Sequence, residues 1–157
     1  MGLETRVRRL EDREAIKELK YEYGRCIDHR RWDGLVDLFA ADATCTYEGV
    51  GTFEGHDELR ELADEFIAEN FVYSCHTFHH PSIHVDDASA TGTWLLEALM
   101  AYHDGRIEWR QGRYEERYRL VDGEWRFDAI TLRSEAQGYR EYELIDHEAY
   151  GSIPRID

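Results

Sequence analysis

Two side chains of this sequence, a carboxylate and an imidazole, could together remove a proton from a substrate. Asp28 ends the stretch YEYGRCID, and His79 lies in the stretch CHTFHHPSIHV. A carboxylate that accepts a hydrogen bond from one imidazole nitrogen fixes the tautomer and makes the other nitrogen more basic, which gives a general base suited to neutral pH. We therefore predict a candidate base in which His79 accepts the proton and Asp28 orients it.

The choice of His79 among neighbouring histidines rests on strand alternation. Successive side chains of a strand point to opposite faces, and His79 shares its parity with Ile83 and Val85, which should face the core. A bulge at Pro81 would reverse this assignment, because an extra residue exchanges the two faces. The other histidines of the run have the opposite parity: His76, His80 and His84. Because the histidines are split between two faces, we predict no metal site here.

Asp28 and Tyr23 each have competing interpretations. Asp28 falls at the C-terminal end of a predicted helix, where the macrodipole disfavours a carboxylate. It is either a surface residue or cap, or a cavity residue held by an imidazolium. Tyr23 lies on the apolar side of the same helix. Its hydroxyl could donate a hydrogen bond to a substrate oxygen, or its ring could simply fill the core.

Further candidates for contact with a substrate lie on predicted strands. Arg133 shares its parity with Phe127, so its guanidinium should face inward, where it would need an anion as a partner. The alternative is a surface position at the end of the strand. Glu97 shares its parity with Leu95 and is equally compatible with the inner and the outer face. The complete set of substrate-binding candidates is Arg133, Tyr47, Glu97 and Trp94.

The elements that must position these residues are helices followed by strands. Apolar spacing predicts helices over 4–28 and 55–70, with a short helix opened by Asp33 and Gly34. Alternation and turn residues predict a hairpin of strands 44–47 and 50–53, then strands over 73–86, 88–103, 107–121 and 124–133. Residues 135–157 form a predicted tail over the pocket or a subunit interface. The order favours an α+β fold, a cone in which helices pack against a strongly curved antiparallel sheet.

Composition narrows the classes of function. The chain of 157 residues fits a single domain over 1–157. Its net charge of −15 disfavours nucleic acid and anionic membranes as partners. We expect a cytoplasmic protein, because no apolar run approaches the ~20 residues of a membrane span and the N-terminus has no apolar signal core. Without phosphate-binding motifs or a CxxC pair, no cofactor is predicted.

The motifs resemble those of the SnoaL-like branch of the nuclear-transport-factor-2-like superfamily. The resemblance runs from about residue 13 to residue 133 and is strongest to the group of hexachlorocyclohexane dehydrochlorinase, bile-acid 7α-dehydratase and scytalone dehydratase. It rests on the following stretches: AIKELKYEYGRCID, WDGLVDLFAADATCTYEG, TFEGHDELRELA, TFHHPSI, ATGTWLLEAL and RYRLVDGEWRF.

The resemblance implies a His–Asp dyad that abstracts a proton while a neighbouring leaving group departs. It assigns His79 as the base, Asp28 as its partner, Tyr23 as the group that polarises a carbonyl and Arg133 as an auxiliary group. It also implies a homo-oligomer, with a trimer favoured. One departure is Ala98, at a position where the bile-acid enzyme carries an acidic residue.

From these observations we predict a cofactor-independent lyase of the dehydratase type, acting on a small, apolar, ring-containing carbonyl compound. Two alternatives stay open. A cyclase or isomerase would use the same base without loss of water, and a binding module or small dioxygenase subunit would use the fold without catalysis.

Overall fold

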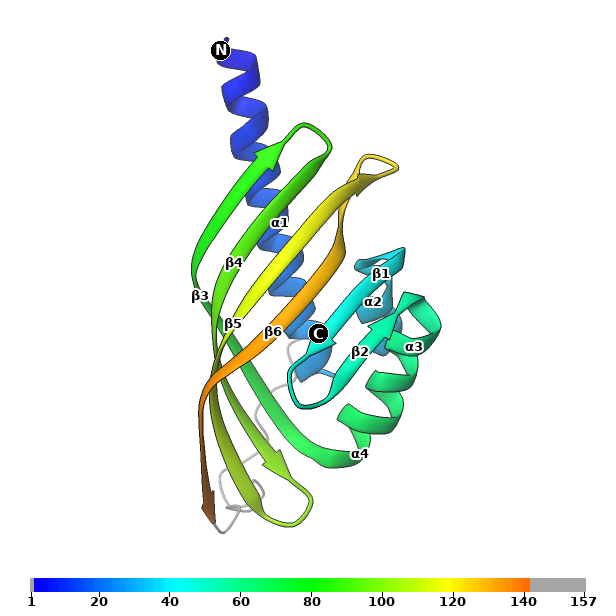
Figure 1. Cartoon of the computed structure of the whole chain (residues 1–157), viewed down its shortest axis with the longest axis vertical. Coiled ribbons are helices and arrows are strands. Elements are labelled where there is room, and N and C mark those ends of the chain that lie inside the picture. Colours follow the sequence, from blue (N-terminus) through cyan, green and yellow to red (C-terminus); the bar gives the residue numbers. More distant parts are fainter. Residues whose placement is uncertain (1, 142–157) are drawn as a thin grey trace, which may run out of the picture.

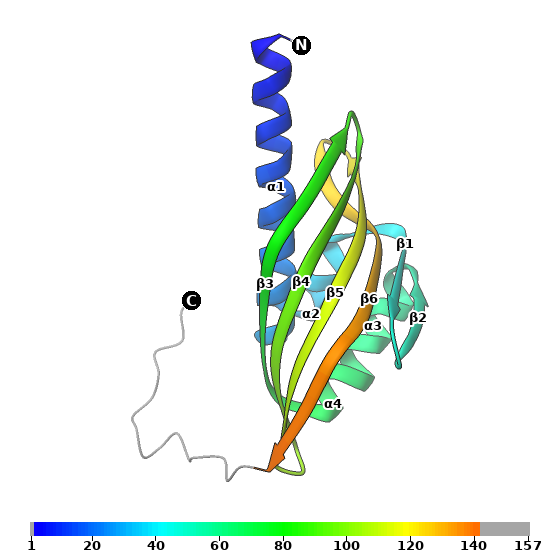
Figure 2. The same ribbon diagram turned by 60° about the vertical axis from the view of Figure 1, so that its left-hand side comes forward.

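The longest helix of the protein, α1 (Leu3–Asp28), owes its position to an apolar stripe in its second half. The computed structural model describes residues 2–141. The buried residues of α1 recur at helical spacing from Ile16 onward and pack on the sheet. The first turns extend past the end of the sheet (Figures 1 and 2), and there Leu3 and Leu10 are exposed.

The remaining helices pack near the C-terminal end of α1. Helix α2 (Trp32–Asp37) follows it directly. A continuous helical run then comprises α3 (Gly55–Glu61), a π-helical turn (Leu62–Ile67) and α4 (Ala68–Asn70), and it leads from β2 to the start of β3 (Figure 1). The predicted helix 55–70 is therefore correct in extent, although nothing in its residues indicated the π-helical turn. None of the helices in residues 2–141 is long and apolar enough to cross a bilayer.

Six strands form one strongly curved sheet with the order β2-β1-β6-β5-β4-β3 (Figure 2). All neighbours are antiparallel except β1 and β6, which are parallel. The strands are β1 (Phe39–Tyr47), β2 (Gly51–Glu54), β3 (Phe71–Asp86), β4 (Ser89–Tyr102), β5 (Arg106–Val121) and β6 (Glu124–Glu141). The core lies between α1 and the concave face of this sheet. The predicted α+β cone is confirmed.

Two boundaries differ from the predictions. Strand β1 begins at Phe39 rather than at residue 44, because the ring of Phe39 is buried against Phe127 and Tyr23. Strand β6 continues to Glu141 and pairs with β5 over its whole length, so residues 135–141 belong to the sheet rather than to a tail. The rest of the predicted tail, 142–157, lies outside the described residues.

Candidate active site

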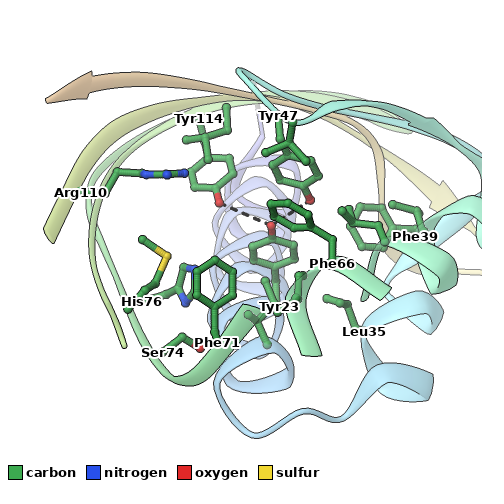
Figure 3. Close-up of a pocket in the computed structure, with 17 residues that line it drawn as sticks. Tyr23, Leu35, Phe39, Tyr47, Phe66, Phe71, Ser74, His76, Arg110 and Tyr114 are labelled. Carbon is green, nitrogen blue, oxygen red and sulfur yellow. Dashed lines mark hydrogen bonds between the residues drawn. The ribbon is translucent and has the colours of Figure 1, made fainter. Parts of the chain in front are cut away.

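A cavity opens between the concave face of the sheet and the helices (Figure 3). Its volume, including the space at its open mouth, is about 790 Å³. Aliphatic and aromatic side chains from α1, α2, the helical run 55–70 and the sheet form most of its wall. The polar groups that line it are Tyr23, Tyr47, Ser74, His76, Arg110 and Tyr114. An apolar wall with a few fixed polar groups is typical of a site for a small ring-containing molecule.

The imidazole that meets Asp28 belongs to His76. Its Nδ1 lies 2.7 Å from Oδ1 of Asp28, and its backbone N–H donates to Oδ2 at 2.9 Å. The hydroxyl of Ser74 donates to Oδ1 at 2.9 Å. The carboxylate at the end of α1 is thus satisfied by strand β3, which offsets the unfavourable helix dipole. Because Nδ1 is occupied by Asp28, Nε2 is the nitrogen of His76 that is available to the cavity.

The prediction that His79 partners Asp28 is wrong, because β3 contains a bulge. His79 pairs with Leu95 but Ser82 pairs with Thr93, so two residues of β3 oppose one of β4. His80, inside the bulge, has a φ of 48°. The parity of Ile83 therefore does not extend back to His79. His79 lies on the outer face, 42% exposed, and its Nε2 is 3.8 Å from Glu97. The sequence contained a sign of this bulge, because a proline such as Pro81 within a strand favours one.

Three tyrosine hydroxyls meet inside the cavity (Figure 3). The Tyr23 oxygen lies 3.0 Å from that of Tyr47 and 3.4 Å from that of Tyr114. Burial raises the pKa of all three phenols well above the ordinary value, so they stay protonated near neutral pH. Because these neutral phenols bond mainly to one another, they can donate hydrogen bonds to a substrate oxygen. Sequence reasoning placed Tyr23 and Tyr47 here and missed Tyr114.

The arginine of the cavity comes from β5, not from β6. Arg110 lines the wall, whereas Arg133 is 60% exposed on the outer face, 3.7 Å from Glu115. A second bulge explains the error: Ala129 pairs with Arg117 and Phe127 pairs with Tyr118, so one extra residue of β6 exchanges its faces. The inward position predicted for Arg133 is therefore wrong.

Comparison with known proteins gives the same architecture. The family profile of the SnoaL-like domain matches residues 8–131. The chain belongs to the SnoaL-like domain family. A hexachlorocyclohexane dehydrochlorinase from Novosphingobium barchaimii LL02 is 22% identical, with a TM-score of 0.78 over 84% of this chain and 92% of that one. A candidate scytalone dehydratase from Novosphingobium aromaticivorans is 23% identical, with a TM-score of 0.77 over 87% and 91%.

A relative in Mycobacterium tuberculosis, itself uncharacterized, is 29% identical over 101 residues, which is 64% of this chain and 68% of the relative. Because the sequence identity of the two solved structures to this chain is low, their similarity shows a shared fold only. Together with the family match they confirm the resemblance inferred from the motifs.

Two further predicted contacts of this SnoaL-like domain are wrong. Glu97 is exposed on the outer face of β4 and accepts a hydrogen bond from Nε1 of Trp109 at 2.9 Å. Trp94 points inward from the same strand but does not reach the cavity wall. Its Nε1 donates to the Tyr118 hydroxyl at 3.0 Å in the core. The open choice for Glu97 is thus decided in favour of the outer face.

A buried ion pair lies behind the tyrosines of this SnoaL-like domain. The ammonium of Lys20 is paired with the carboxylate of Glu116, and both side chains are fully buried. Nζ also lies 3.4 Å from the ring centre of Tyr114 and 4.5 Å from that of Tyr23. Burial, partly opposed by Glu116, lowers the pKa of Lys20 to about 8. Sequence reasoning missed this pair, because a lysine on an apolar stripe is ordinarily interpreted as snorkelling to the surface.

The arrangement offers a base and hydrogen-bond donors rather than a metal centre. In residues 2–141 no group of three or more His, Cys, Asp or Glu side chains is placed to hold a metal ion. The polar groups around the cavity are an oriented imidazole, neutral phenols, a guanidinium and the hydroxyl of Ser74, which donates to Asp28. Such a set can remove a proton next to a carbonyl group and stabilise the oxyanion that results.

Proposed function

We propose that this SnoaL-like protein is a cofactor-independent lyase that eliminates a leaving group from a small, ring-containing carbonyl compound. The observation that carries the proposal is the His76–Asp28 pair, whose Nδ1–Oδ1 distance of 2.7 Å leaves Nε2 of His76 to the cavity. Relatives of this fold that are named dehydrochlorinase and candidate dehydratase support an elimination.

In the proposed reaction, the carbonyl oxygen of the substrate accepts hydrogen bonds from the hydroxyls of Tyr23 and Tyr47. Nε2 of His76 takes the proton from the α-carbon, and the electrons of the C–H bond form an enolate whose oxygen the phenols stabilise. The enolate collapses to an enone as the bond to the leaving group at the β-carbon breaks. Asp28 stabilises the imidazolium formed in the first step.

A β-hydroxyl group is our choice of leaving group, and the imidazolium of His76 supplies the proton that converts it to water. In this route the α-proton is removed and the leaving hydroxyl is protonated on the same face of the substrate, the face toward His76. It requires no other acid, which agrees with Ala98 at the inward position of β4 that pairs with His76.

The test follows enone absorbance while β-hydroxy ketones, acids and thioesters are offered to wild type, His76→Ala and His79→Ala. The two histidines lie on the same strand, but only His76 faces the cavity. We expect turnover to fall by about 10²–10⁴-fold in His76→Ala, the usual worth of a general base, and to stay near wild type in His79→Ala. Retained turnover in His76→Ala would sink the proposal, provided that thermal melting shows a folded variant.

The same base also suits an isomerase, the second candidate. An imidazolium that holds the abstracted proton can return it to a different carbon without loss of water. Mass spectrometry of the product separates the two reactions, because isomerisation leaves the mass unchanged and dehydration lowers it by one water molecule.

A further inference from the structure

Arg110 is the only arginine or lysine among the cavity-lining residues of the described chain. We propose that it binds a carboxylate of the ligand, so that the protein selects ring-containing carbonyl compounds that also carry a carboxylate. This assignment rests on the proposed function for the identity of the ligand as a substrate. The binding site itself can be tested without any reaction.

The guanidinium is held on one edge by a buried carboxylate. Nε and one terminal nitrogen, Nη2, both lie 2.6 Å from Oε1 of Glu108, which is fully buried. The hydroxyl of Tyr102 donates to the other oxygen of Glu108. Among residues 2–139, whose side chains the structure describes, the remaining edge, with Nη1, has no hydrogen-bond partner. Figure 3 shows the side chain reaching along the cavity toward Tyr114. A preorganised guanidinium edge matches the two oxygens of a carboxylate.

The strand register places this edge at a useful distance from the base. His76 pairs with Ala98, and Ala98 pairs with Arg110, so the three lie in one row across the sheet. Adjacent strands are about 4.8 Å apart, which puts the backbones of His76 and Arg110 about 10 Å apart. The methyl group of Ala98 leaves space between the two side chains. A carboxylate above Ala98 can therefore reach Arg110 while the next carbons face Nε2 of His76.

The charges around the cavity determine whether it binds anionic ligands more tightly than neutral ones. The chain as a whole is acidic, and Asp28 and Glu108 lie at the same wall, so an anion has no general attraction to this cavity. We therefore expect the preference for a carboxylate over its neutral isostere to come mainly from Arg110, the lining residue with a permanent positive charge. If the only role of Arg110 were to neutralise Glu108, the cavity would bind both forms equally or prefer the neutral one.

The experiment compares benzoate and 2-naphthoate with their amides, which have nearly the same shape, by titration calorimetry. A hydrogen bond to a charged group is worth about 1.5–3 kcal/mol, so we expect wild type to bind each acid about 10–100-fold more tightly than its amide. Arg110→Met should abolish that preference. The matched control is Arg113→Met, on the outer face of the same strand in an exposed pair with Glu135, and it should keep the preference.

Because Arg110→Met leaves Glu108 buried without its positively charged partner, the double variant Arg110→Met/Glu108→Gln is measured beside it. The assignment is overturned if wild type binds the amides as tightly as the acids, if it binds none of these ligands, or if the folded double variant retains the preference. These ligands have no leaving group, so the outcome is independent of the elimination assay. A cavity that selects carboxylates but eliminates nothing would refute the proposed function alone.

Discussion

Replacing Lys20 by methionine should destabilise the protein strongly, because the ion pair that it forms with Glu116 has no access to water. Both side chains are fully buried, and the second oxygen of Glu116 accepts a hydrogen bond from the hydroxyl of Tyr118. Methionine fills a similar volume but leaves Glu116 without its counter-charge. Loss of one partner of a buried pair typically costs about 3–5 kcal/mol. The folded domain is expected to have a total stability of only about 5–15 kcal/mol, so this loss is a large part of it.

The double variant Lys20→Met/Glu116→Gln removes both charges and keeps an acceptor for Tyr118. Its free energy of unfolding should be within about 2 kcal/mol of wild type, because the desolvation cost of the two ions disappears with their attraction. Lys17→Met is the control on the same helix, where an exposed pair with Glu14 is worth less than about 1 kcal/mol. Urea unfolding at pH 7 measures all four proteins. A Lys20→Met variant within about 1 kcal/mol of wild type would refute the reasoning.

Two further predictions concern pH and backbone packing. The pKa of Lys20 is about 8 in the folded protein and has its ordinary value of 10.5 in the unfolded chain, so the unfolded chain binds the extra proton between these pH values. Wild type should therefore become more stable relative to the double variant as pH rises through this window, measured by urea unfolding at each pH, since a neutral Lys20 amine can still donate a hydrogen bond to Glu116, which methionine cannot. Gly112→Ala should destabilise by about 1–3 kcal/mol, because its Cβ would lie 2.7 Å from a backbone oxygen of β6. Gly138→Ala, where a Cβ meets nothing within 4 Å, should be nearly neutral in the same assay.

The fold was predictable because its signals are local and repeated. The apolar stripe from Ile16 to Cys26 fixes α1, and the Asp-Gly pairs at 104–105 and 122–123 mark hairpins that the structure contains. The motif resemblance supplied the family. The order of strands, with β1 inserted parallel to β6, depends on contacts between distant segments that periodicity does not encode.

The site was less predictable, because the inward face of a strand is a count that a single bulge reverses. One bulge in β3 exchanges His79 for His76, and one in β6 turns Arg133 outward. Both errors came from extending the parity of a strand end across an irregularity. Pro81 was a visible sign of the first bulge. The extra residue of the β6 bulge is Asp128, which is not a residue typical of bulges. Nothing in the sequence of β6 therefore warned against placing Arg133 in the cavity.

The cavity shows a common principle behind these residues, because each polar group in or behind it is held by a partner that the protein itself provides. Asp28 holds His76, Glu108 holds Arg110, and the hydroxyls of Tyr23, Tyr47 and Tyr114 hold one another. Side chains fixed in this way lose little freedom when a ligand arrives, because their orientation is already set by the protein. The partners lie one step further from the ligand than the groups they orient. A parity count does not find these partners, because Asp28 and Glu108 come from positions that the alternation of a single strand does not connect to His76 and to the cavity.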